Sequence, residues 1–151
     1  MSAAQSPGGL RVDFYIVAEA SGTARLTVAC RLAEKAYLAG HSVLVWHSSP
    51  EELREFDALL WTFTDRAFVP HEPLMPGTPA DAPVLLSAGV TPPGPVDVII
   101  NLAAELPPCL TLAKRVAEIV DGDAARRQAG RARFKAYREM GIEPSSHNLG
   151  D

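Results

Sequence analysis

A chain of 151 residues with a hydrophobic content of 47% is long enough to bury one substantial core. Its formal net charge of −4 argues against a protein that wraps duplex DNA over a broad surface. No segment reaches the roughly 18 consecutive apolar residues of a membrane helix, and Met1–Leu10 has neither the charge nor the apolar run of a signal peptide. We therefore expect a soluble, cytoplasmic protein without a membrane partner.

The first part of the chain predicts a βαβ unit followed by a second helix. Residues 12–17 are β-rich, residues 23–39 repeat apolar side chains at helical spacing, and residues 42–46 form a second apolar run. This order implies parallel strands joined by a right-handed crossover. Pro50 then opens a helix that ends near residues 61–63, with acids in its first turn.

Two further strands are predicted at residues 84–87 and 96–102, each preceded by a proline-rich connection. Before the first of these connections, residues 68–71 lead into a loop. Residues 115–120 fit both the alternation of a strand and a turn of helix, and we favour a strand that ends at Asp121.

These elements predict a single-domain α/β fold, a Rossmann-like three-layer sandwich with a mainly parallel sheet. We expect the domain to span residues 11–143, with tails at residues 1–10 and 144–151. The loop at residues 18–23 has one glycine where a dinucleotide fingerprint needs three, so we expect no phosphate-binding loop there.

Few residues suggest catalysis or metal binding. His47 follows the second strand, but no nucleophile with an orienting acid accompanies it, and we interpret it as a surface histidine. Three acids on one helix face are explained by solvation: Glu51, Glu52 and Glu55. Cys30 and Cys109 lie among apolar neighbours and are expected to be core residues. We expect no catalytic activity, no cofactor and no metal.

Positive charge is concentrated near the carboxyl end of the chain. Residues 126–141 hold six cations and one carboxylate, so the rest of the chain carries a net charge of −9. Asp121 or Asp123 can cap a helix here and Gly141 suits its end, so we predict a helix from Ala124 to Met140. Four alanines form a narrow strip that could lie against the sheet: Ala125, Ala129, Ala132 and Ala136.

One face of this helix combines cations with an aromatic ring. Its members recur at spacings of three and four: Arg127, Arg131, Phe134, Lys135 and Arg138. Such a face suits a ligand that is both anionic and apolar, because guanidinium groups hold carboxylates or phosphates in bidentate geometry. Two alternatives stay open, a merely solvated face and a direct single-stranded nucleic-acid-binding protein that stacks bases on Phe134 and Tyr137.

From Val12 onward the sequence resembles the chi subunit of bacterial DNA polymerase III holoenzyme. The resemblance is carried by Leu60-Trp61, by residues 68–71 and by Val98-Ile99-Ile100-Asn101-Leu102. Its most specific part is the block R-x-R-[aromatic]-K-x-Y-R-x-x-G at residues 131–141.

The resemblance implies a non-catalytic accessory subunit of the clamp-loader complex in DNA replication. Such subunits join the complex through a partner subunit, psi, and bind the acidic C-terminal tail of single-stranded DNA-binding protein (SSB), which ends in aspartates and a phenylalanine. DNA contact would be mainly indirect.

By position, the resemblance implies six tail-binding residues: Val120, Arg127, Arg131, Phe134, Lys135 and Arg138. Arg131 or Lys135 would take the α-carboxylate and Arg127 the aspartates, while Val120 and Phe134 would line an aromatic slot. Phe134 stands where a tyrosine is often found, and Arg127 replaces a lysine. The psi side corresponds to Leu60, Trp61, Phe68, Val69, Pro70 and His71, of which Phe68 and Val69 could equally be core residues.

Overall fold

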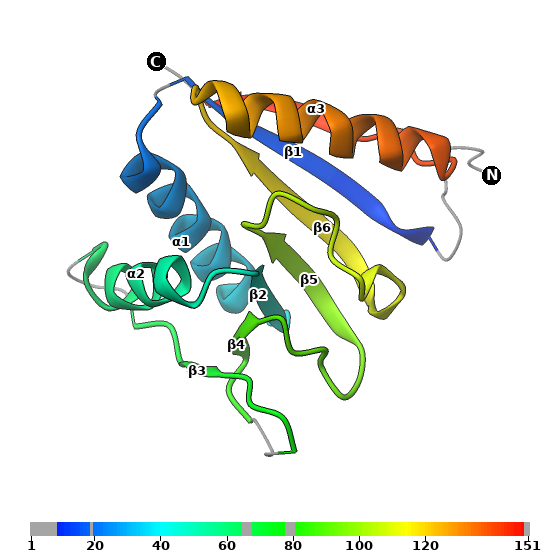
Figure 1. The fold of residues 1–151 in the computed structure, drawn as a ribbon. Helices are drawn as coiled ribbons and strands as arrows, with labels where there is room; N and C mark the ends of the chain where they lie inside the picture. The colour runs from blue at the N-terminus through cyan, green and yellow to red at the C-terminus, as the bar shows by residue number, and fades with distance from the viewer. Residues whose placement is uncertain (1–8, 19, 65–67, 78–80, 150–151) are drawn as a thin grey trace.

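One sheet of seven strands organises the described part of the chain, in the order β3-β4-β2-β5-β6-β1-β7 (Figure 1). The structure is a computed structural model that describes residues 9–18, 20–64, 68–77 and 81–149. All the strand pairings are parallel. The strands are β1 (Arg11–Val17), β2 (Val43–His47), β3 (His71–Pro73), β4 (Val84–Ala88), β5 (Val96–Asn101), β6 (Ala113–Val120) and β7 (Ser145–Leu149).

The described residues include three α-helices, which begin and end on local signals. They are α1 (Gly22–Leu38), α2 (Pro50–Thr62) and α3 (Ala124–Glu139), and a 3-10 turn, η2, spans Leu110–Leu112. Each α-helix is capped at its N-terminus by a side-chain oxygen, from Ser21, Ser49 and Asp123 respectively. After α3 the chain turns at Gly141, whose φ of 88° favours glycine.

The helices cover both faces of the sheet and create two separate hydrophobic clusters. Residues of α1 and α2 pack with one set of strand side chains, and residues of α3 and η2 pack with the other set. Cys30 lies buried in the first cluster and Cys109 in the second, as free thiols. Both are core residues, as predicted, and burial raises the pKa of Cys30 to about 12.

The predicted α/β, Rossmann-like architecture is confirmed. The segment at residues 115–120 is a strand, as we favoured, and β6 begins two residues earlier at Ala113. Within the described ranges no helix is both long and apolar enough to cross a bilayer.

Two short strands depart from the expectations. Residues 145–149, expected to belong to a C-terminal tail, form β7 beside β1, and residues 71–73, expected to be loop, form β3 beside β4. Both are edge strands. Neither has an apolar alternation that would predict a strand, and each is held in the sheet by backbone pairing with its neighbouring strand. Residues 1–8 of the expected N-terminal tail lie outside the described residues.

Candidate functional site

Helix α3 packs on the sheet through Gly130, Arg133 and Tyr137, its three buried residues. A Cβ atom at Gly130 would lie 2.7 Å from Cγ2 of Val120, so this glycine allows the helix to approach β6 closely. The predicted alanine strip is therefore wrong as the packing face: Ala132 is exposed. Arg133, counted among the cations of the helix, points inward.

A buried carboxylate explains the inward arginine. Glu118 on β6 accepts hydrogen bonds from Arg133 Nε at 2.8 Å, from Tyr137 Oη at 2.7 Å and from Asn101 Nδ2 at 3.0 Å. Burial raises the pKa of Glu118, and the charge of Arg133 opposes this shift. These contacts fix the rotation of α3 about its axis and therefore decide which of its residues face outward.

The outward side of α3 borders a hollow that we name the α3 groove. This hollow of about 270 Å³ lies between α3, β1 and β7, and is lined by Phe14, Ile16, Val120, Arg127, Gly130, Arg131, Phe134 and Ser146. The rings of Phe14 and Phe134 lie 5.1 Å apart between centroids. The groove thus has an apolar interior with two arginines among its lining residues.

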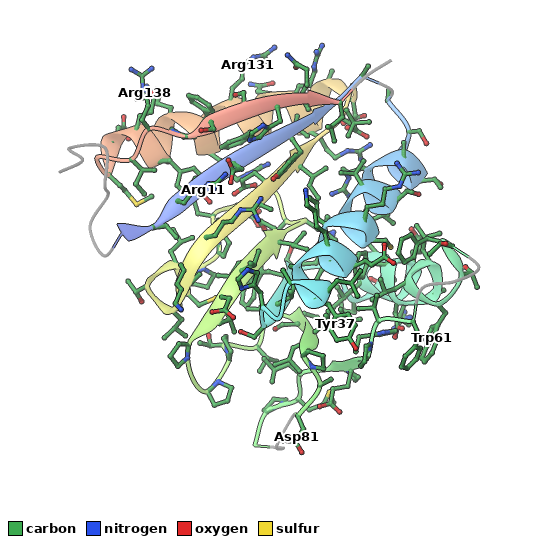
Figure 2. The ribbon with its side chains drawn as sticks, turned by 180° about the vertical axis from the view of Figure 1, so that it is seen from behind. Arg11, Tyr37, Trp61, Asp81, Arg131 and Arg138 are labelled. Atoms are coloured by element: carbon green, nitrogen blue, oxygen red, sulfur yellow. The ribbon has the colours of Figure 1, made fainter. Side chains whose placement is uncertain are left out.

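A second hollow of about 430 Å³ continues along the same helix, lined by Arg131, Phe134, Lys135, Arg138 and Glu139. Arg131 and Phe134 line both hollows, so the two form one surface along α3. In Figure 2, Arg131 and Arg138 project outward from α3, far from Trp61. The Arg138 guanidinium lies 3.5 Å from the exposed carboxylate of Glu143.

The end of α2 and the start of β3 carry an aromatic cluster made of Trp61, Phe68 and His71, in which Trp61 and Phe68 are exposed and the side chain of His71 is buried beneath them. Trp61 and Phe68 are 55% and 62% exposed. Ring centroids lie 5.6 Å apart between Trp61 and Phe68, and 4.8 Å apart between Trp61 and His71. His71 is held by Asp57 at 2.7 Å. Such exposed, mutually packed rings are typical of protein interfaces.

His47 and Glu52 are not the solvated groups that we expected. His47 is buried, and its Nε2 lies 2.7 Å from Glu52 Oε1. Glu52 also pairs with Arg25, which lies on α1, the neighbouring helix on the same face of the sheet. No local pattern predicts this contact, because α1 and α2 meet only in the fold. Burial alone would raise the pKa of Glu52, but His47 and Arg25 outweigh it and lower that pKa.

Comparisons with known proteins agree with one another. The family model described as "DNA polymerase III chi subunit, HolC" matches residues 10–145. The chain belongs to this chi subunit family. DNA polymerase III subunit chi of Pseudomonas aeruginosa is 42% identical, over 92% of this chain and 96% of that protein. The subunit of the same name from Haemophilus influenzae is 30% identical, over 91% of this chain and 96% of its own length.

Solved structures with a similar fold are distant in sequence. The crystal structure of T4 UvsW matches 95% of this chain and 42% of its own, with a TM-score of 0.65 and 10% identity. The C-terminal domain of the DEAD-box protein Dbp5 matches 91% of this chain and 90% of its own, with a TM-score of 0.56 and 14% identity. At these identities the likeness describes the fold of this chi family member alone.

The structure brings the six predicted tail-binding residues of this chi family member together along α3. Val120, Arg127, Arg131 and Phe134 line the α3 groove, while Lys135 and Arg138 line its continuation. Sequence reasoning missed Phe14, Ile16, Gly130 and Ser146. No local sequence pattern identifies Phe14 or Ser146 as groove residues, because they reach the groove only through the pairing of β1 with β7.

The six residues expected on the psi side are divided. Trp61 and Phe68 are exposed, whereas Leu60 and Val69 are each 1% exposed and belong to the core. Pro70 is half-buried, and the side chain of His71 is buried against Trp61. Phe68 is therefore a surface residue, and Val69 is the core residue of that pair. In the parts of the chain that are described, no group of three or more His, Cys, Asp or Glu side chains could hold a metal ion.

Proposed function

We propose that this chi family member is a non-catalytic accessory subunit in DNA replication that binds the acidic C-terminal tail of SSB in the α3 groove. Its family is that of a DNA polymerase III subunit. The observation that carries the proposal is an apolar hollow that has Arg127 and Arg131 in its lining and the rings of Phe14 and Phe134 packed together.

The chemistry of such a tail matches the groove. The terminal phenylalanine ring would enter the hollow between Phe134 and Val120, because burial of an aromatic ring against apolar side chains is favourable. Arg131 or Lys135 would bind the α-carboxylate, and Arg127 the aspartates that precede it. Arg138 would be an outer contact, since its charge is partly engaged by Glu143.

Direct stacking of single-stranded nucleic acid on α3 is less well supported. Tyr137, one of the two rings considered for stacking, is 0% exposed and donates its hydroxyl hydrogen to Glu118. Phe134 is left as the one accessible ring of this helix, and it packs on Phe14. Binding by stacking uses several successive aromatic platforms, which α3 does not supply.

Titration calorimetry with a peptide that ends Asp-Asp-Ile-Pro-Phe tests the proposal. We expect micromolar affinity that weakens as salt screens the ion pairs. Arg131→Ala should weaken binding about tenfold or more, because a charge-assisted hydrogen bond is worth about 1.5–3 kcal/mol. Arg31→Ala on α1, also an exposed arginine, is the matched control and should bind as the wild type does. Equal affinity for wild type and Arg131→Ala would remove that arginine from the site.

We further propose that the aromatic cluster binds a partner subunit, psi, and so connects the protein to the clamp-loader complex in the cytoplasm. The cluster supports this because Trp61 and Phe68 expose apolar surface that packing within the chain leaves uncovered. It lies at the end of α2, away from α3 (Figure 2), so both partners could bind at once.

A further inference from the structure

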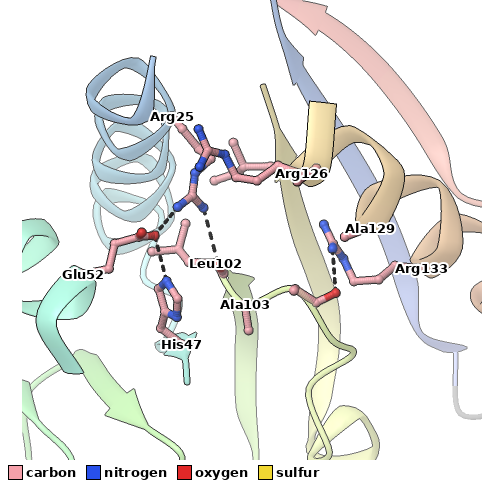
Figure 3. A pocket seen from close by; sticks show the side chains of 11 residues that line it. Arg25, His47, Glu52, Leu102, Ala103, Arg126, Ala129 and Arg133 are labelled. Atoms are coloured by element: carbon pink, nitrogen blue, oxygen red, sulfur yellow. Dashed lines mark hydrogen bonds and ion pairs between the residues drawn. The ribbon is translucent and has the colours of Figure 1, made fainter. Parts of the chain in front are cut away.

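A separate cavity lies at the carboxyl edge of the sheet (Figure 3), and none of its lining residues lines the α3 groove. It measures about 250 Å³ and we name it the switch-point cavity. Its polar lining consists of Arg25, His47, Glu52, Arg126 and Arg133, and apolar residues complete it, among them Ala103. Neither the SSB tail nor psi accounts for this cavity.

The cavity occupies the position where parallel α/β sheets commonly bind ligands. After β2 the chain crosses to α2 on one face of the sheet, and after β5 it crosses to η2 on the other face. Neighbouring strands whose connections leave in opposite directions open a crevice at their carboxyl ends. Because all strands are parallel, α1, α2 and α3 also direct their N-termini, with their positive dipole ends, toward this edge.

The charges that face the cavity are predominantly cationic. Arg126 and Arg133 are paired with Asp121 and Glu118, at 2.7 Å and 2.8 Å. Both of these carboxylates have fully buried side chains and are absent from the lining of the cavity. Of the residues that the structure describes, Glu52 is the one carboxylate that lines it, and it is shared between Arg25 and His47.

Arg25 adds an independent indication of a ligand. Arg25 is 3% exposed. Its Nη1 donates to Leu102 O at 3.3 Å, and its Nη2 pairs with Glu52. Among the described residues its Nε finds no acceptor. A buried donor without an acceptor is unfavourable and is uncommon in native proteins.

We propose that the switch-point cavity binds the phosphate group of a small ligand, either inorganic phosphate or a small phosphate ester. Three guanidinium groups line one cavity, and a phosphate has enough oxygens to accept from all three, whereas a carboxylate has two. No described residue of the loop after β1 lines the cavity, so the missing glycine fingerprint does not forbid this site. Arg126 is the most accessible of the three, with a side chain 36% exposed.

The test is an amide NMR titration of the full chain with inorganic phosphate, against chloride at equal ionic strength. We expect saturable shifts around Arg25, His47 and Ala103, with a dissociation constant of about 1 mM or tighter. Arg126→Gln should weaken binding about tenfold, because it removes one charge-assisted contact. The matched control is Arg127→Gln, the adjacent residue that lines the α3 groove, and it should leave phosphate binding unchanged.

Three results would overturn this site. They are shifts that chloride reproduces, shifts that do not saturate, or equal weakening by Arg126→Gln and Arg127→Gln. A parallel titration with glycerol 3-phosphate distinguishes the sources: tighter binding than inorganic phosphate assigns the site to an ester, and weaker binding assigns it to free phosphate. Because Arg126 lies outside the α3 groove, Arg126→Gln should still bind the tail peptide, so failure of either proposal is recognisable separately.

Discussion

At the scale of single residues, Gly130 decides how closely α3 lies on β6. Its backbone faces the side chain of Val120, and both residues line the α3 groove. A larger residue would have to push the helix away from the strand, since packed interiors have little free space. The shape of the groove therefore depends on a residue that carries no charge and no ring.

Gly130→Ala should lower the free energy of unfolding by about 1–3 kcal/mol through overpacking against Val120, although alanine is the better helix former. It should also weaken tail-peptide binding. Urea unfolding and calorimetry measure the two effects. The double variant Val120→Ala/Gly130→Ala makes room for the methyl group and should regain part of the stability lost in Gly130→Ala. A Gly130→Ala protein as stable as the wild type would show that the close approach is not needed.

At the scale of elements, α3 separates two sites because different residues of the helix face each site. Arg127, Arg131 and Phe134 face the α3 groove, while Arg126 and Arg133 face the switch-point cavity. Adjacent residues on a helix are about 100° apart, so Arg126 and Arg127 can line different hollows. The end of α2 carries the third surface, the aromatic cluster.

For the aromatic cluster, Trp61→Ala should impair capture of psi in a pull-down while peptide binding in the α3 groove stays intact. The reason is that a large exposed ring at the centre of an interface often contributes much of its binding energy. Leu38→Ala removes another exposed apolar side chain, 73% exposed on α1, and is the control. Full retention of psi by Trp61→Ala would place the interface elsewhere.

At the scale of the whole molecule, buried carboxylates hold neighbouring strands and helices together. Asp13 on β1 lies 2.9 Å from Arg115 on β6 and 3.0 Å from His147 on β7. Asp121 accepts from Arg126 on α3. Burial alone would raise the pKa of Asp13 and of Asp121. In each residue the hydrogen bonds and the nearby arginines outweigh the effect of burial and lower the pKa.

The lowered pKa values of Asp13 and Asp121 predict that the protein loses stability in acid. A carboxylate with a pKa in the folded state below its ordinary value of 3.8 stabilises the fold above that value, and the stabilisation is lost as pH falls through the folded-state pKa. The free energy of unfolding should therefore fall steeply between about pH 5 and pH 2. Asp13→Asn should flatten this dependence, measured by urea unfolding across pH, whereas the exposed Asp81→Asn should not. An unchanged slope in Asp13→Asn would contradict the role given to Asp13.

Local patterns were enough to predict α1, α2, α3 and most strands, because apolar spacing, caps and turn glycines are written in consecutive residues. They also predicted the exposed cations of α3. They did not predict β7 or the inward turn of Arg133, since each depends on a partner far along the chain, β1 for the strand and Glu118 for the arginine. The pairing of Glu52 on α2 with Arg25 on α1 was missed for the same reason.

The central claim is that the α3 groove binds an acidic peptide with an aromatic end. Amide NMR mapping of the bound Asp-Asp-Ile-Pro-Phe peptide on the intact protein tests it most directly. We predict that the largest shifts occur at Ile16, Gly130, Phe134 and Ser146, which surround the hollow on three elements. Shifts centred instead on Trp61 and Phe68, or on the switch-point cavity, would contradict the claim.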